Sequence, residues 1–370
     1  MKILFICGSL EPGKDGVGDY VEVLSKRLGK LEHEVFKIAL HDRFLKCDFK
    51  DQEGQLRISD QVRWPEKEQL CSMVISKFSP DVISFHFVPF AYSKKGILMS
   101  VLTYLKRILR GRPLHLMFHE LWVEGRSFKS LVLSFLQRIT ILRLIRKLGP
   151  KYIHTSNEYY QHRLLKYGVN SKLYPVFSNV PLCYDMAYVR QAIDQKLGVK
   201  KECNVPFFLC FGSIHSGGEW DVLMDTIVSN YEKAVIISVG IVGRNGNLIW
   251  RKLKEEHNLN IQFIELGYVR AEELSYLLYL SDFGITTNPE VLLKKSGSVA
   301  AFIVHGTPVI YLRKDYADRT FQPCESNIPD LCFHISFIQK CGFEAIRKLK
   351  RPPINDFQPE KTFINDVLNF

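Results

Sequence analysis

Short apolar runs alternate with stretches of helical periodicity along the entire chain. This alternation is typical of parallel sheets that are covered by helices. In the first half, the pattern predicts strands at 2–7, 34–39, 81–86, 113–118 and 151–154. It predicts helices near 18–30, 67–78, 96–110, 128–148 and 157–167 between them. We therefore expect one doubly wound α/β domain in this half.

A second series of the same kind begins after a break in the pattern. Its predicted strands are 206–211, 234–240, 260–265, 282–286 and 307–311, and its helices lie near 219–231, 246–257, 271–280 and 296–304. The segment between the two series carries Pro175 and Pro181, then a polar helix and a charged loop, which indicates a linker. The chain thus predicts two tandem doubly wound parallel-sheet domains, with a shared cleft at the carboxyl ends of their strands.

The domain boundaries follow from this reading. The first domain is expected at 1–185 and the second at 200–350. After residue 312 the alternation of strands and helices is lost, and a basic helix is expected at 337–350. A short helical pattern at 359–369, within the terminal segment 351–370, is expected to pack back on the first domain.

The charge of the chain points to an anionic partner. The net charge is +11, and residues 1–185 hold 29 Lys and Arg against 18 Asp and Glu, whereas the remainder holds 21 of each. Residues 82–119 and 126–151 contain no acidic side chain. Such a field attracts phosphorylated small molecules, anionic membranes or nucleic acids. No RNP-type motif, zinc module or helix-turn-helix pattern accompanies it, so we expect no nucleic-acid partner.

Cysteine usage and hydropathy bear on location. The nine cysteines form no C-x-x-C pair, which predicts reduced thiols in the cytoplasm and neither zinc nor disulfides. No signal peptide is recognised at the N-terminus. Polar and basic residues interrupt the most apolar stretch, 131–148, so we expect no membrane-spanning helix. The expected location is cytoplasmic, with a peripheral position at the inner face of the membrane left open.

Two loops carry candidate binding chemistry. Residues 8–20 form a glycine-rich loop before a helix, so amides around Gly16 suit a phosphate, although the glycines also suit a structural turn. The spacing is neither G-x-G-x-x-G nor a P-loop. In the second domain, Lys295 precedes Ser296, Gly297 and Ser298 at a helix start, the composition of a diphosphate cradle. The alternative is an ordinary helix N-cap.

The ordered set of motifs resembles the GT-B glycosyltransferases, in particular bacterial family 4-like enzymes. Residues 16–21 and 31–35 look like the opening glycine-rich loop of that family and the approach to its second strand. Further matches follow in the family's order at 211–213, 221, 266–269, 272–274, 281–285 and 295–310. The resemblance covers nearly the whole chain. It implies two Rossmann-like domains that face a central cleft, with a nucleoside diphosphate sugar held mainly by the second.

The resemblance also assigns roles to individual residues. Amides around Gly16 would face the acceptor or the donor phosphates, Gly212 and Ser213 would line the cleft, and Tyr268 and Val269 would flank the nucleotide base. Ser296, Gly297 and Ser298 would hold the diphosphate. His119 matches a histidine that lines the sugar pocket, with a structural role as the alternative. Glu290 lies near a family glutamate that contacts ribose or sugar, and His119 and Glu290 are the catalytic candidates.

Two departures from the family pattern matter. The Glu-x7-Glu pair of retaining enzymes is absent, because Leu293 and Ala301 occupy its positions. The family's Arg and Lys after the first strand of the second domain are also missing. A diphosphate leaving group needs positive charge or preorganised donors, which Lys295, the helix dipole at Ser296 and Arg244 would supply. No Asp-x-Asp follows a predicted strand, so neither a metal nor a cofactor is expected.

The long helix 128–148 places Phe128, Leu131, Phe135, Ile139, Leu142 and Ile145 along one face. A basic amphipathic helix can lie on an anionic membrane, and the alternative is a helix that covers the sheet and exposes a basic face to solvent. The two interpretations are compatible.

Together these observations predict a hexosyltransferase-like enzyme that moves a sugar from a nucleoside diphosphate sugar to a hydroxyl of a glycan, lipid-linked or small-molecule acceptor. The alternative is a GT-B-fold binding or scaffold protein without catalysis. The stereochemical outcome stays open, because an inverting enzyme needs a general base, for which His119, Glu120, Asp15 and Asp19 are candidates.

Overall fold

The computed structural model describes residues 1–125, 127–183, 186–202, 204–316, 318, 320–353 and 358–368. The chain divides into two compact units. Unit 1 contains Met1–Pro175, Ala317–Phe321 and Gln358–Phe370, and unit 2 contains Val176–Tyr316 and Gln322–Phe357. The passage between the units lies at Pro175, nearer the N-terminus than the predicted boundary at 185, and two later segments return to unit 1.

Unit 1 is built on an eight-stranded sheet in the order β3-β4-β2-β1-β5-β6-β7-β8. All neighbouring strands are parallel except β3 and β4. The strands are β1 (Lys2–Cys7), β2 (Glu34–Asp42), β3 (Phe49–Gln52), β4 (Gln55–Ser59), β5 (Val82–Phe87), β6 (Leu114–Phe118), β7 (Tyr152–Thr155) and β8 (Lys172–Leu173). The five predicted strands of this half are confirmed, whereas the β3–β4 hairpin and β8 were not predicted.

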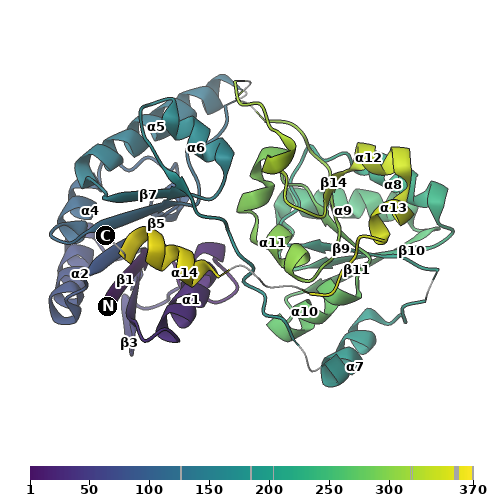
Figure 1. Ribbon diagram of the computed structural model, residues 1–370, viewed down its shortest axis with the longest axis horizontal. Coiled ribbons are helices and arrows are strands. Elements are labelled where there is room, and N and C mark those ends of the chain that lie inside the picture. Colours follow the sequence, from purple (N-terminus) through teal and green to yellow (C-terminus); the bar gives the residue numbers. More distant parts are fainter. Residues whose placement is uncertain are drawn as a thin grey trace. The chain divides into compact units, whose positions relative to one another are not determined.

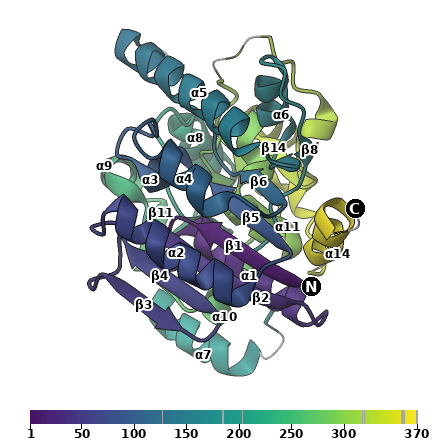
Figure 2. The ribbon, with the colours of Figure 1, turned by 90° about the vertical axis from the view of Figure 1, so that its left-hand side faces the viewer.

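Helices cover both faces of this sheet (Figures 1 and 2). They are α1 (Gly16–Gly29), α2 (Trp64–Phe78), α3 (Pro89–Tyr92), α4 (Leu102–Leu109), α5 (Phe128–Leu148), α6 (Glu158–Leu165) and α14 (Pro359–Phe363), which a π-helical segment (Ile364–Leu368) continues. Helix α4 packs between α2 and α5, and α14 packs against α1. The Tyr174 hydroxyl donates to the Pro359 carbonyl at 2.7 Å, which ties the C-terminal segment to the end of the sheet.

Unit 2 contains a six-stranded, fully parallel sheet in the order β11-β10-β9-β12-β13-β14. Its strands are β9 (Phe207–Phe211), β10 (Ala234–Val239), β11 (Ile261–Gly267), β12 (Phe283–Thr286), β13 (Val309–Tyr311) and β14 (Cys332–His334). Its helices are α7 (Met186–Leu197), α8 (Trp220–Asn230), α9 (Gly243–His257), α10 (Ala271–Leu280), α11 (Gly297–Val304), α12 (Ile335–Cys341) and α13 (Phe343–Arg347). The five predicted strands are again confirmed.

Two expectations for unit 2 need correction. The chain after residue 312 does not lose its strands, because β14 extends the sheet beside β13. The helix expected at 337–350 is two short helices, because Gly342, at φ = 77°, ends α12 and precedes α13. Glycine adopts this backbone conformation at little cost, whereas other residues rarely do.

Helix α5 buries a different stripe from the apolar face that its sequence predicts. Its buried residues are Gln137, Thr140, Ile141 and Leu144. The apolar residues near its start are exposed instead, to 81% for Phe128, 54% for Leu131 and 50% for Phe135. The buried stripe includes polar side chains that form hydrogen bonds inside unit 1. Gln137, for example, donates to the Lys95 carbonyl at 2.8 Å. The start of the apolar face of α5 is therefore exposed, and the buried side of the helix is the stripe around Gln137.

Within the described ranges, no helix is long and apolar enough to cross a membrane. The eight cysteines in those ranges are free thiols.

Candidate functional site

The sheet of unit 2 reverses its strand order between β9 and β12, because β10 and β11 lie on one side of this pair and β13 and β14 on the other. Ligands of open α/β sheets bind at the carboxyl ends of the strands, where the order reverses. Gly212 follows β9 with φ = 88° and donates its amide to the Val239 carbonyl at 2.9 Å. Nearby, the amide of His215 donates to the Thr287 hydroxyl at 2.8 Å, which joins the loops after β9 and β12. Ser213 is exposed between them.

A cavity of about 400 Å³ opens at the carboxyl ends of β10 and β11. Arg244 and Asn247, near the start of α9, contribute to its lining, together with Glu265. The amide of Gly240 donates to the Gly267 carbonyl at 2.7 Å, which holds the two strand ends together. Arg244 is exposed and is one of the residues that line this cavity.

Tyr268 and Val269 follow β11 but lie in different environments. Tyr268 is 74% exposed, as a ring that stacks on a base requires. Val269 is only 7% exposed and packs in the core of unit 2. Because its side chain already packs against apolar neighbours, the expected contact of Val269 with the base stays a prediction.

The predicted diphosphate cradle is the N-terminus of α11. Ser296 is the N-cap, and its hydroxyl accepts from the Val299 amide at 3.3 Å and from Asn288 Nδ2 at 3.0 Å. The hydroxyls of Ser296 and Ser298 lie 2.9 Å apart. Lys295 and Gly297 are half-buried beside them. The start of the helix therefore presents hydroxyls and its positive dipole end.

Glu290 follows β12 at the start of a 3-10 helix (Glu290–Lys295). Its amide donates to the Arg313 carbonyl at 3.0 Å, and its carboxylate accepts from the Tyr311 hydroxyl at 3.3 Å. Glu290 is therefore held at the carboxyl end of β13. Leu293 and Ala301, which occupy the positions of the Glu-x7-Glu pair, are fully buried, so neither position faces a ligand.

The loop after β1 does not present all its amides to a ligand. The carboxylate of Asp15 caps α1 and accepts from the amides of Val17 and Gly18, each at 3.0 Å. Burial raises the pKa of Asp15, and these two hydrogen bonds oppose that rise. A Cβ at Gly18 would lie 2.4 Å from the Ser9 carbonyl oxygen, so glycine is required there for packing. The amides next to Gly16 thus already have an anionic partner, which disfavours a phosphate at this helix start.

His119 follows β6 and begins a row of buried polar groups in unit 1. Its Nε2 lies 2.9 Å from His86 Nδ1, and His86 Nε2 lies 2.9 Å from the Ser84 hydroxyl. The same hydroxyl lies 2.8 Å from His115 Nδ1, and His115 Nε2 lies 2.9 Å from His154 Nδ1. The row crosses β5, β6 and β7. The Tyr20 ring packs edge-on against His119 at 4.9 Å.

The last group of this row is Asp366, whose Oδ2 lies 3.2 Å from His154 Nε2. Lys172 pairs with its other oxygen at 3.2 Å. Burial lowers the pKa values of His86 and His115 well below the ordinary value. Burial also lowers the pKa of His154, although Asp366 opposes this effect. These histidines are therefore neutral at pH 7.

The sequence analysis identified His119 but missed Ser84, His86, His115, His154 and Asp366. A signal was present, because Ser84 and His86 are two residues apart in an apolar strand and so share one face. Which partners that face meets depends on the strand order and on the return of the C-terminal segment to unit 1.

No family model and no curated protein sequence matches the chain. Solved structures are similar to it over their full length. Sucrose-phosphate synthase from Thermosynechococcus elongatus has 14% identity and a TM-score of 0.64, covering 100% of this chain and 95% of its own. A glycosyltransferase from Rickettsia africae has 17% identity and a TM-score of 0.60, with coverages of 100% and 99%.

A third similar structure is the UDP-GlcNAc 2-epimerase from Neisseria meningitidis bound to UDP-GlcNAc. It has 15% identity and a TM-score of 0.57, and the match covers both chains completely. Identities at this level establish the fold. The chain therefore has the fold of the GT-B glycosyltransferases, with two parallel-sheet α/β domains in tandem.

Proposed function

We propose that the protein transfers a sugar from a nucleoside diphosphate sugar to a hydroxyl acceptor, without a bound metal. The observation that carries this proposal is the carboxyl edge of the unit 2 sheet. There the cavity that Arg244 lines, exposed Tyr268 and the start of α11 lie at the ends of neighbouring strands. Similar structures include proteins in complex with UDP-glucose and UDP-GlcNAc, which supports a nucleotide-sugar donor.

Each group at this edge has a chemical role in the proposal. A diphosphate gains negative charge as it leaves, so donors that are already in place stabilise the transition state. Near β12, Lys295 and the start of α11 offset the negative charge of the diphosphate. Near β10, Arg244 offsets the same charge. Tyr268 offers its ring to the base, and Glu290 accepts from a ribose or sugar hydroxyl.

The proposal is tested by calorimetric titration with UDP-, GDP- and ADP-sugars, together with an assay for donor turnover on candidate acceptors. We expect binding of one nucleotide class and weaker binding by Arg244→Gln. Arg251→Gln is the matched control, because Arg251 is exposed on the same helix outside the residues that line the cavity. Binding without turnover supports the scaffold alternative, and C2 epimerisation of the donor supports an epimerase. Failure to bind any of these donors contradicts the proposal.

We further propose that the acceptor is anionic or is presented at an anionic membrane surface, as in polysaccharide biosynthesis at the cytoplasmic face. The exposed apolar residues of α5 support this. They are Phe128, Leu131, Val132, Phe135 and Leu136. The same helix carries Lys129, Arg138, Arg143, Arg146 and Lys147. Each cation near an anionic bilayer contributes about 1 kcal/mol, and the apolar side chains add burial in the interface.

Cosedimentation with vesicles tests this second part. We expect salt-sensitive binding to vesicles that contain anionic lipid, and none to neutral vesicles. Replacing Phe128, Leu131 and Phe135 by Ser should weaken binding at constant charge. Leu259→Ser is the control, because Leu259 is 94% exposed in unit 2. If the wild type does not bind anionic vesicles at low salt, an acceptor presented at a membrane surface is ruled out and a soluble anionic acceptor is favoured.

A further inference from the structure

The row of buried groups in unit 1 is a continuous hydrogen-bonded path. It runs from His119 through His86, Ser84, His115 and His154 to Asp366, and every step lies between 2.8 and 3.2 Å. The four inner groups are at most 1% exposed, whereas the Asp366 side chain is 22% exposed. The path therefore connects a residue at the carboxyl edge of the sheet with a carboxylate that meets solvent.

The carboxylate at one end determines the direction of every bond. A carboxylate only accepts, so His154 donates from Nε2 and its Nδ1 must accept. His115 then donates from Nε2 to His154, and its Nδ1 accepts from the Ser84 hydroxyl. A neutral imidazole has one donor and one acceptor nitrogen, so no other arrangement satisfies all these contacts.

The same rule continues to the far end. The Ser84 oxygen accepts from His86 Nε2, and His86 Nδ1 accepts from His119 Nε2. His119 consequently carries its proton on Nε2, and its Nδ1 is the proton-accepting nitrogen. Asp366, more than two hundred residues away in sequence, thereby sets the tautomer of His119.

We infer that this path makes His119 a proton acceptor at Nδ1 and that Asp366 is the transient sink for the proton. In this step, a hydroxyl proton forms a bond to His119 Nδ1 while His119 Nε2 passes its proton to His86 Nδ1. Each inner group, in the order His86, Ser84, His115 and His154, accepts one proton and releases another. The proton that His154 releases from Nε2 then binds to Asp366. The steps run in reverse when His119 returns a proton to solvent.

The chemistry of the interior favours such coordinated transfer. A single imidazolium among fully buried groups would be poorly solvated, whereas coordinated transfer leaves each inner histidine neutral. The groups that face the ends are Tyr20 at His119, and Tyr174 and Lys172 beside His154 and Asp366. Only His119 would contact the reacting hydroxyl; the other five are positioning residues. This inference rests on the proposed function only for the identity of that hydroxyl.

The experiment uses ¹⁵N NMR of the histidine rings in the full-length protein, because the ring nitrogens show which atom carries the proton. We expect the Nε2–H form for His119, His86, His115 and His154. Ser84→Ala should leave His115 and His154 fixed by Asp366, and should release His86 and His119 into mixed tautomers. Ser25→Ala is the control, because Ser25 is buried to a similar degree and its hydroxyl has no partner among the described residues.

A wild type with the opposite tautomers, or a His119 tautomer that Ser84→Ala leaves unchanged, would overturn the inference. These readouts need no activity, so they separate it from the proposed function. Where sugar transfer is measured, Ser84→Ala should lower kcat by roughly tenfold or more and leave the donor KM unchanged, since positioned acid–base groups contribute about 10²-fold or more. An unchanged kcat would rule out the path as a route for the proton.

Discussion

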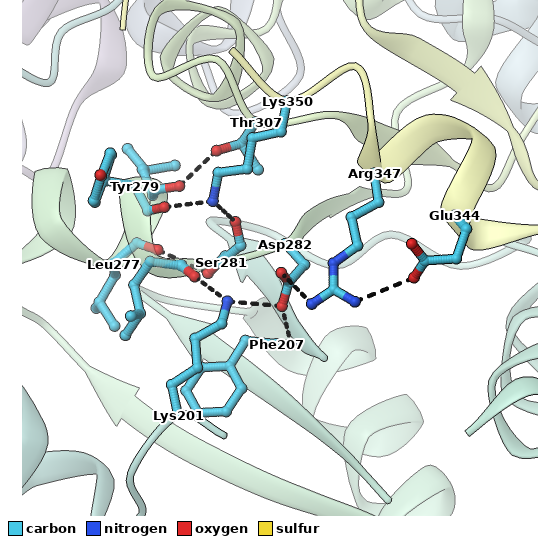
Figure 3. Close-up of polar contacts among 12 residues, drawn as sticks. Lys201, Phe207, Leu277, Tyr279, Ser281, Asp282, Thr307, Glu344, Arg347 and Lys350 are labelled. Atoms are coloured by element: carbon cyan, nitrogen blue, oxygen red, sulfur yellow. Dashed lines mark hydrogen bonds and ion pairs between the residues drawn. The ribbon is translucent and has the colours of Figure 1, made fainter. Parts of the chain in front are cut away.

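Asp282 is the centre of an ion network at the amino ends of β9 and β12 (Figure 3). It is 5% exposed, and its carboxylate accepts from Lys201 at 2.7 Å, from Arg347 at 3.0 Å and from the Phe207 amide at 2.8 Å. The network joins the amino ends of β9 and β12 to α13. We predict that Asp282→Asn strongly destabilises unit 2.

The size of the destabilisation follows from the loss of the carboxylate charge beside Lys201 and Arg347. Removing one partner of a buried ion pair costs about 3–5 kcal/mol. Lys201 and Arg347 are partly exposed, at 23% and 25% of their side chains, so solvent screens some of this cost. We therefore expect a loss of about 2–4 kcal/mol. In a unit of roughly 150–250 residues, each kcal/mol lowers the melting temperature by about 2–4 °C.

The assay is thermal unfolding followed by calorimetry, with Asp221→Asn as the control. Asp221 pairs with Lys252 at 3.4 Å, but both side chains are largely exposed, so its loss should leave the melting temperature almost unchanged. A cost for Asp282→Asn below about 1 kcal/mol would refute the reasoning, because it would mean that desolvation cancels the attraction.

The pH dependence supplies a second test of the same pair. Burial opposes ionisation of Asp282, yet Lys201, the Phe207 amide and Arg347 outweigh it and lower its pKa. With a folded-state pKa below the unfolded value of about 3.9, the stabilisation is complete above that value and is lost as the pH falls through the folded pKa. The difference between wild type and variant should therefore shrink below about pH 4.

Three other predictions concern packing and the proposed chemistry. Gly306→Ala should destabilise unit 2 in calorimetry, because Gly306 has φ = 71° and an added Cβ would lie 1.9 Å from the Arg351 carbonyl oxygen; Gly297→Ala, whose Cβ meets open space, should not. Lys295→Ala should raise the donor KM and lower turnover in a transfer assay, and unchanged kinetics would remove Lys295 from the site. EDTA should leave transfer intact, whereas loss of activity that Mn²⁺ restores would contradict the metal-free proposal.

The strands of both sheets were predictable because each buried parallel strand is a short, continuous apolar run between helices. Elements outside that pattern were missed. The strands β3 and β8 consist of exposed residues, and β14 is three residues long. The return of 317–321 to unit 1 was also missed. Its Phe321 ring packs on Tyr159 at 5.3 Å, a tertiary contact that local sequence does not encode.

The candidate site was predictable where it depends on strand ends and less so where it depends on side-chain direction. The loops at Gly212 and Ser296 follow strands, and a loop of this kind lies at the carboxyl edge of any parallel sheet. Val269 and the amides near Gly16 could not be assigned in this way. The role of Val269 depends on the burial of its side chain, and the role of the amides near Gly16 depends on their hydrogen bonds to Asp15. Both features depend on tertiary packing.

The net charge differs between unit 2, which is proposed to bind the donor, and unit 1, which is proposed to attract the acceptor. Residues 176–316 and 322–357, which form unit 2, hold 19 Lys and Arg against 19 Asp and Glu, so no net field draws an anionic donor to unit 2. Donor binding must therefore rest on local groups such as Arg244 and Lys295, whose short-range contacts salt screens weakly. In unit 1 the excess of positive charge is spread over the surface, and several of its cations lie on the exposed helix α5. Attraction from that surface acts over a distance comparable with the Debye length, about 10 Å at 0.1 M salt. Raising the salt concentration should consequently weaken acceptor or membrane association well before it weakens donor binding.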